Sequence, residues 1–306
     1  MHYHVPVLKD EVLTYLAPAE GQKIIDATLG DGGHTLALLK KEAEVLGLDY
    51  NQESLKRAEK RIKEQSLEKN FTPKLGNFRN IDNLATKEGF EKVHGILFDL
   101  GFSSTQLEQD ETGLSFQENQ PLDMRLDKTL GVTSSDLLHA LSEDELARLF
   151  KEYSDERHAK RFASAIVKHR ELEKLQTTEQ LAKLISAAAP PGYEKGRIHP
   201  ATRVFQALRI AVNDEIENLK LALPRAAHLL LPGGRMVVIS FHSLEDKAVK
   251  DFGRTVQPDL IELTDRPVTP SDIELKKNVR SRSAKMRVFE KQEAAEKEGS
   301  ATSANN

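Results

Sequence analysis

Cysteine and tryptophan are absent from this sequence of 306 residues. The absence of cysteine excludes disulfides, thiolate metal sites and every mechanism that needs a thiol nucleophile, including attack on a pyrimidine ring through sulfur. A chain without cysteine is compatible with a reducing compartment.

Long apolar runs are also missing. No stretch approaches the roughly 20 apolar residues of a membrane-spanning helix, so we expect no membrane partner. Residues 1–8 carry charged and polar side chains where a signal peptide needs an apolar run, which favours a cytoplasmic protein.

Neither sign of charge dominates, because 44 Lys and Arg stand against 48 Asp and Glu and give a net charge of −4. The overall charge therefore does not indicate a nucleic-acid partner, and any basic surface must be local. One stretch, residues 276–291, is crowded with basic side chains, and we interpret it as a candidate phosphate-binding segment. A second basic group, Arg157, Arg161 and Lys168, is interleaved with acidic residues and is more typical of a solvated helix face.

Four short apolar runs rich in branched residues predict buried strands, at residues 23–28, 45–49, 95–99 and 235–240. Helical patterns follow the first two runs, and this alternation predicts a doubly wound, Rossmann-like α/β sheet. Well over 100 residues separate the third run from the fourth, far more than one crossover helix requires. We therefore expect an inserted domain between them.

The insert is expected to be helical. Ser142 with Glu145, and Thr177 with Gln180, form capping-box patterns that precede apolar residues at helical spacing. A later amphipathic pattern predicts a single helix over residues 205–231. We expect three parts: a sheet domain over residues 1–105 and 206–291, an all-helical substrate domain over 106–205, and a disordered tail over 292–306.

A glycine-rich turn, residues 26–35, joins the first predicted strand to the first helix, and its backbone can approach a ligand closely. Asp49 lies 19 residues after Gly30 at the end of the second strand, where an acid can accept both hydroxyls of a ribose. Together they predict a cofactor that contains adenosine. The glycine spacing differs from the G-x-G-x-x-G of dinucleotide sites, which favours S-adenosylmethionine.

Ligands of open α/β sheets bind outside the carboxyl ends of the strands, so the residues after the third and fourth strands are candidates for the site. Asp99 to Phe102, an acid, two residues and an aromatic, resembles the Asp-Pro-Pro-Tyr segment of amino-methyltransferases, which binds an exocyclic amine. Phe102 is equally compatible with stacking on a base and with a place in the core. His242 follows the fourth strand, and Ser243 with Asp246 resembles a helix start.

His2 and His4 are close in sequence, but no clear third ligand lies nearby, so we expect no metal site.

Seven segments, in order along almost the whole chain, resemble the signatures of the MraW methylases, also called ribosomal RNA small subunit methyltransferase H. They are residues 4–8, 26–35, 99–104, 121–125, 199–209, 240–246 and 281–287. The resemblance implies an S-adenosylmethionine-dependent enzyme that methylates N4 of cytosine 1402 in 16S rRNA of the small ribosomal subunit. It also implies a class I methyltransferase fold interrupted by a helical substrate domain. The absence of cysteine agrees with N4 chemistry, since C5 methylation ordinarily proceeds through a thiolate adduct.

Position by position, the resemblance implies cofactor contacts at Gly32, Gly33, His34, Asp49, Phe78, Asp99 and Gln106. Phe78 is expected to pack on the adenine. We assign catalytic roles to Asp99 and His242, and leave open whether Asp99, His242 or water accepts the amine proton. The expected substrate contacts are Phe102, Ser103, Ser104, Arg125, Arg280, Arg282 and Arg287.

Two other interpretations stay open from the sequence. One is a dinucleotide-dependent dehydrogenase of similar fold. The other is a non-catalytic RNA-binding protein that keeps a nucleotide pocket only as a scaffold. The sequence is compatible with a homodimer as well as with a monomer.

Overall fold

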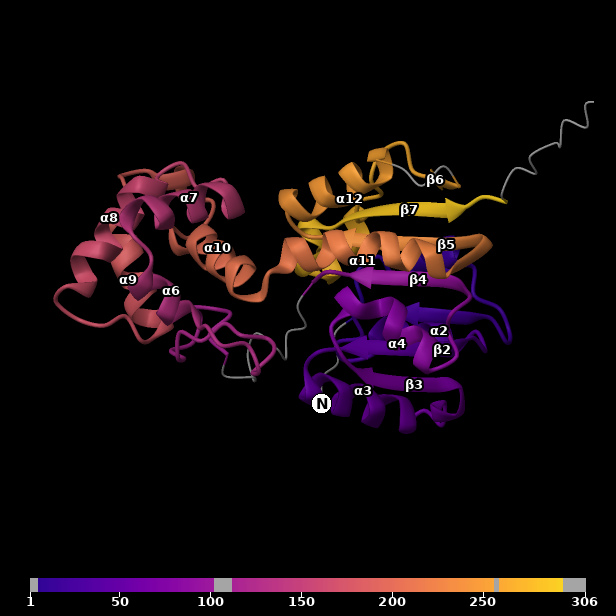
Figure 1. Ribbon diagram of the computed structural model, residues 1–306. Coiled ribbons are helices and arrows are strands. Elements are labelled where there is room, and N and C mark those ends of the chain that lie inside the picture. Colours follow the sequence, from indigo (N-terminus) through magenta and orange to yellow (C-terminus); the bar gives the residue numbers. More distant parts are fainter. Residues whose placement is uncertain (1–4, 102–111, 256–258, 294–306) are drawn as a thin grey trace, which may run out of the picture.

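The computed structural model describes residues 5–101, 112–255 and 259–293, which form two lobes (Figure 1). One lobe contains a seven-stranded sheet in the order β3-β2-β1-β4-β5-β7-β6. Its strands are β1 (Lys23–Asp26), β2 (Glu44–Asp49), β3 (Phe71–Leu75), β4 (Val93–Asp99), β5 (Leu230–Ser240), β6 (Leu260–Glu262) and β7 (Lys285–Lys291). β7 runs antiparallel to β5 and β6, and the remaining pairs are parallel. The predicted α/β sheet is confirmed.

Helices cover both faces of the sheet because successive strand residues point to opposite sides. Ile24 packs in the core of one face, together with residues of the first two helices, while Ile25 packs in the core of the other face. The first face is covered by α1 (Lys9–Leu16), α2 (Gly33–Leu39) and α3 (Gln52–Lys63). The second is covered by α4 (Ile81–Lys87), α11 (Glu215–Leu229) and α12 (Ser243–Thr255).

Three strands were not predicted, and each lacks the continuous apolar run of a buried central strand. β3 lies at the edge of the sheet, contains Pro73 and is only partly buried. β6 is short and carries exposed residues. β7 contains both charged and apolar residues, and its basic residues were counted in the predicted basic cluster. A short helix, α13 (Asp272–Lys277), precedes β7 and carries the remaining lysines of that cluster.

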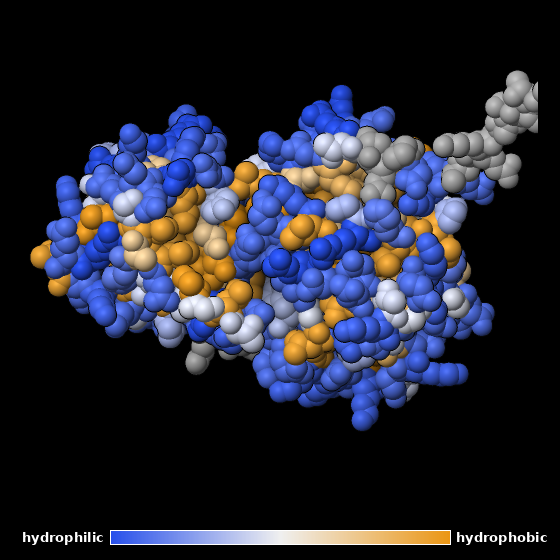
Figure 2. All heavy atoms as spheres, viewed as in Figure 1, coloured by the Kyte–Doolittle hydropathy of each residue, from blue (hydrophilic) through white to orange (hydrophobic). Residues whose placement is uncertain are grey.

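The second lobe is helical, as expected. It contains α6 (Ser134–Ala140), α7 (Glu143–Ser154), α8 (Ala159–Arg170), α9 (Thr178–Ala188) and α10 (Ala201–Asn213), packed around one hydrophobic core. Both predicted capping boxes are present, at the starts of α7 and α9. Figure 2 shows hydrophobic residues gathered on the visible face of this lobe near its junction with the sheet lobe, which is mostly hydrophilic in the same view.

The prediction of a single helix over residues 205–231 is wrong, because the helical segment is interrupted at Asp214, between α10 and α11. Asp214 has left-handed backbone angles (φ 52°, ψ 38°). The apolar face of α10 belongs to the core of the insert, whereas that of α11 belongs to the sheet core, and one straight helix cannot serve both. We therefore propose that the insert ends at this break, and not at residue 205.

Residue 292, which was expected to start the disordered tail, belongs to the sheet lobe, since the Gln292 N–H donates to the carbonyl of Asp259 at 2.6 Å. Residues 294–306 lie outside the described part of the chain. None of the helices in the described ranges combines the length and the apolar character needed to cross a membrane.

Candidate active site

Two neighbouring cavities lie at the carboxyl ends of β1, β2 and β4. The Asp49 cavity, about 450 Å³, is lined by Asp49, Phe78 and the 126–130 loop of the insert. The His34 cavity, about 310 Å³, is lined by His34, residues 5–7 and the start of η4 (Val279–Ser283). Both volumes fall within the range of small-molecule sites, about 300–1,000 Å³. The cavities meet where they share six lining residues: Thr28, Gly30, Asp99, Leu100, Gly101 and Glu245.

The glycine-rich turn has the geometry that lets a ligand approach its backbone closely. Gly32 has φ 72°, a value that suits glycine, and it begins α2 without a side-chain cap. A Cβ on Gly33 would meet Cγ of Pro6 at 2.7 Å, so no larger residue fits there. The Thr35 hydroxyl donates to Asp26 Oδ2 at 2.7 Å and ties the end of the turn to its start. Burial raises the pKa of Asp26, and the hydrogen bond from Thr35 opposes this.

Asp49 ends β2 and is buried beside this turn. The backbone N–H of Gly30 donates to its Oδ2 at 2.8 Å, and that of Asn51 donates to Oδ1 at 2.8 Å. Burial raises the pKa of Asp49 to about 7, although both backbone hydrogen bonds favour the ionised form. Each carboxylate oxygen keeps a second lone pair that can accept a hydrogen bond from a ligand hydroxyl.

Phe78 begins the short 3₁₀-helix η2 (Phe78–Asn80) and lines the same cavity as Asp49. Its ring packs edge-on to Phe98, with ring centroids 5.8 Å apart and planes 85° apart. The ring is therefore held by the sheet core while it also lines the cavity, an arrangement that suits contact with a planar ring of a ligand.

Asp99 ends β4 at the junction of the two cavities. Its backbone N–H donates to Thr28 Oγ1 at 2.6 Å, and its Oδ2 lies 3.4 Å from Nε2 of His34. Asp99 Oδ1 and both ring nitrogens of His34 are buried without a hydrogen-bond partner among the described residues. Buried polar atoms are rarely left unsatisfied, so these atoms fit a polar ligand in the crevice. Buried polar atoms without a partner suit a cofactor that carries adenosyl and amino acid groups, because both groups form hydrogen bonds.

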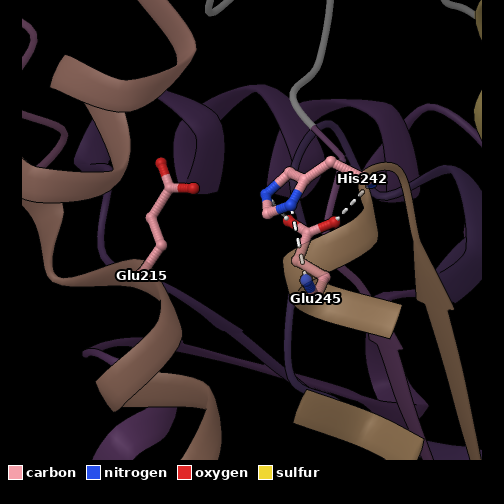
Figure 3. A group of neighbouring side chains, drawn as sticks. All are labelled: Glu215, His242 and Glu245. Atoms are coloured by element: carbon pink, nitrogen blue, oxygen red, sulfur yellow. Dashed lines mark hydrogen bonds and ion pairs between the residues drawn. The ribbon is translucent and has the colours of Figure 1, made fainter. Parts of the chain in front are cut away.

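His242 has a local role that the sequence did not suggest. The Glu245 N–H donates to its Nδ1 at 3.3 Å, and the His242 N–H donates back to Glu245 Oε2 at 3.2 Å (Figure 3). His242 and Glu245 thus form a capping-box-like pair at the start of α12, in place of the predicted Ser243 and Asp246. Asp246 instead pairs with Lys285 and Arg287.

Glu215 lies beside this pair, and ligand atoms of Glu215, His242 and Glu245 are all within 4.8 Å of one another. Such a group has the residue types of a metal site. The geometry does not fit a metal, because His242 Nδ1 accepts the Glu245 N–H, which leaves the ring proton on Nε2. Nε2 is the nitrogen that faces the carboxylates, at 3.0 Å from Glu245 Oε1, and a ligand to a metal needs a free lone pair there.

Among the four arginines predicted to contact substrate, Arg287 does not fit the role. Its side chain is only 8% exposed, and it donates to Asp246 Oδ1 and Glu262 Oε1, both at 2.8 Å. These two ion pairs engage its guanidinium and link β7 to α12 and β6. The sequence did not indicate this placement, because Arg287 lies on β7 between β5 and β6, where both faces of the strand are buried.

Arg125 is likewise engaged within its own loop. Its Nε and Nη2 donate to the two oxygens of Asp123, at 2.7 and 3.0 Å, and its Nη1 donates to the carbonyl of Leu130 at 2.7 Å. This side chain shapes the 123–130 loop that borders the Asp49 cavity. Arg280 and Arg282 are exposed in η4, and Arg280 lines the His34 cavity, so they remain candidate phosphate contacts.

Four predicted contacts, Phe102, Ser103, Ser104 and Gln106, lie outside the described residues, as do His2 and His4. Polar residues that border the crevice and were not predicted as site residues include Arg209, Asn213, Glu215 and Glu245. The available signal was polar residues that interrupt the apolar pattern around residue 213, and an acid three residues after His242.

Comparison with known proteins identifies the family. The family model described as the MraW methylase family matches residues 1–292. A protein of Thermomicrobium roseum named ribosomal RNA small subunit methyltransferase H is 46% identical over 308 residues, covering 94% of this chain and 93% of its own. The protein of the same name from Deinococcus radiodurans is 46% identical over 299 residues, covering 97% and 92%. The chain therefore belongs to the MraW methylase family, whose members are methyltransferases that use S-adenosylmethionine.

Proposed function

We propose that this protein transfers the methyl group of S-adenosylmethionine to the exocyclic N4 amine of cytosine 1402 in 16S rRNA of the small ribosomal subunit. The relatives' name supports a small-subunit rRNA substrate. The observation that carries the proposal is the continuity of the two cavities. An acid suited to a ribose lines one of them, and Asp99, with a carboxylate oxygen that lacks a partner among the described residues, lies where they meet.

The residues of the crevice have distinct binding roles in this proposal. Asp49 would accept hydrogen bonds from the ribose hydroxyls, and Phe78 would pack on the adenine. The glycine turn, including Gly32 and Gly33, and the ring of His34 would contact the remainder of the cofactor. When bound, the cofactor supplies an electrophilic methyl group on a sulfonium.

Asp99 acts on the amine. The lone pair of cytosine N4 is delocalised into the ring, which makes the amine a poor nucleophile. Hydrogen bonds from the amine protons to Asp99 and to the backbone carbonyl of Leu100 would localise that lone pair. Alignment of the amine with the methyl group can contribute about 7–11 kcal/mol to lowering the barrier. The base must leave its helical stack to reach this crevice, which costs least in a single-stranded region.

We assign His242 a positioning role and not that of a proton acceptor. Its Nδ1 accepts the Glu245 N–H and its Nε2 carries the proton, so the neutral ring has no free lone pair. Of the three candidate acceptors, Asp99 and water remain. His242 instead fixes the start of α12 and the orientation of Glu245.

Transfer of a labelled methyl group to small-subunit particles tests the proposal. Particles with cytosine at position 1402 should accept label, and matched particles with uracil at that position should not, because uracil lacks the amine. Equal labelling of both, or of neither, would disprove the assigned target. Calorimetry with S-adenosylmethionine and NAD separates the dehydrogenase alternative, since only the first should bind. A protein that binds particles but transfers no label would be the non-catalytic alternative.

We further propose a cytoplasmic location, in keeping with a ribosomal substrate. Sedimentation of the full chain distinguishes the homodimer from the monomer.

A further inference from the structure

A partly buried, hydrogen-bonded pair, Arg209 and Glu215, stands at the junction of the insert with the crevice. Arg209 Nε lies 3.1 Å from Glu215 Oε1, and the two side chains are 17% and 15% exposed. Arg209 lines the His34 cavity and Glu215 lines the Asp49 cavity. Because the two cavities meet at Asp99, the pair borders the same space as the proposed amine-binding carboxylate.

The backbone that carries the pair is fixed by Asn213. Its Oδ1 accepts the Leu126 N–H at 2.9 Å, and its Nδ2 donates to the Met124 carbonyl at 2.8 Å. Asn218 Nδ2 donates to the Asn213 carbonyl at 2.9 Å across the break at Asp214. Arg209 and Glu215 are therefore held by the insert loop on one side and by α11 on the other, which suits a rigid recognition element.

Charged and titratable groups from several elements face Glu215. Arg209 comes from α10, Glu245 and His242 from the start of α12, and Tyr50 from the end of β2. Burial raises the pKa of Glu215 and the charge of Glu245 adds to this, while the charge of Arg209 and its hydrogen bond to Glu215 oppose it. A carboxyl in this setting can hold a proton and donate a hydrogen bond.

We propose that Glu215 and Arg209 recognise the Watson–Crick edge of the target cytosine, an inference that rests on the proposed function. The edge of cytosine presents an amine donor and two acceptors, N3 and O2. Asp99 and the Leu100 carbonyl take the amine protons, the Glu215 hydroxyl donates to N3, and the Arg209 guanidinium donates to O2. Uracil carries a hydrogen on N3 and an oxygen at position 4, so it mismatches at two of these contacts.

The test combines variants at Glu215 with a substrate that lacks the N3 acceptor. Single-turnover methylation is measured on small-subunit particles with cytidine or 3-deazacytidine at position 1402. Glu215→Leu should slow methylation of cytidine by roughly 10-fold or more, the scale of one base contact. It should add little to the loss that 3-deazacytidine causes, because both changes remove the same hydrogen bond. Glu215→Gln, whose amide donates from the same place, should stay within a few fold of wild type.

The matched control is Glu217→Leu, an exposed acid on the same helix that pairs with Lys220. It should behave as wild type on both substrates. Losses at Glu215 and at N3 that multiply independently would overturn the inference. If the wild type methylates neither substrate, the proposed function fails instead.

A pH profile supplies a second measurement that does not depend on Glu215→Leu folding. The wild-type rate should fall as pH rises through the pKa of Glu215, because the donor is lost, and Glu215→Gln should lack this fall. An identical fall in both proteins would overturn the inference. Thermal melts and S-adenosylmethionine titrations of each variant show that fold and cofactor site are intact.

Discussion

Protonation of Asp49 should weaken binding of the adenosine part of the cofactor. The carboxyl is buried, its pKa is raised to about 7, and in the free protein it accepts the backbone N–H groups of Gly30 and Asn51. Ribose hydroxyls donate hydrogen bonds, and they bond more strongly to a carboxylate than to a neutral carboxyl. Affinity should therefore rise as pH increases through 7.

The size of the effect follows from the ionised fraction. With a pKa of about 7, about 9% of Asp49 is ionised at pH 6 and about 91% at pH 8. The apparent Kd scales inversely with the binding-competent fraction, so adenosine should bind about 10-fold more tightly at pH 8 than at pH 6. Adenosine is the probe for calorimetry because it contains the ribose and no group that titrates in this range.

Asp49→Asn provides the decisive comparison. The variant should bind adenosine roughly 10-fold more weakly than wild type at pH 8, the loss of one charge-assisted hydrogen bond, and its affinity should not change with pH. Glu53→Gln, which removes an exposed acid at the start of α3, should keep the wild-type dependence. A flat wild-type profile, or the same slope in Asp49→Asn, would show that the ribose binds elsewhere.

Four further predictions concern the other residues discussed above. Asp99→Ala should lower the single-turnover methylation rate by roughly 10²-fold at saturating cofactor, and a near-wild-type rate would exclude its role. Replacing Arg280 and Arg282 by Gln should flatten the dependence of RNA affinity on salt, whereas an unchanged slope would remove them from the phosphate interface. Arg287→Met should destabilise the fold by about 1.5–3 kcal/mol in urea melts, because Asp246 and Glu262 each lose a charge-assisted hydrogen bond. Asn213→Leu should cost about 1–3 kcal/mol for each of two backbone groups left unpaired, and wild-type stability would show that the loop is held otherwise.

The strands that could be predicted are those with a continuous apolar sequence. The central strands are buried on both faces, so β1, β2, β4 and β5 were recognised from their branched residues. The proximity of the glycine turn and Asp49 was also predictable, because both lie at fixed places relative to those strands.

The basic cluster shows why composition alone was insufficient. Residues 276–291 form one crowded stretch in sequence, but the structure divides it among α13, η4 and β7. Strand geometry then turns Arg287 into the interior while Arg282 stays exposed in η4. The buried Arg287 can be distinguished from the exposed Arg282 only when residues 285–291 are known to pair with β5. That pairing depends on residues far away in sequence.

The missed polar residues follow from a different constraint. A chain segment that leaves the core of the insert and enters the core of the sheet lobe must change which of its faces is buried, and the change occurs at Asp214. Polar residues can occupy the break at Asp214, because residues there do not need to pack into either hydrophobic core. Asn213 and Glu215 stand there, beside the crevice that the carboxyl ends of the strands create. Attachment of the insert at this edge therefore brings polar side chains to the crevice, so the same short segment is both a structural break and a candidate part of the substrate site.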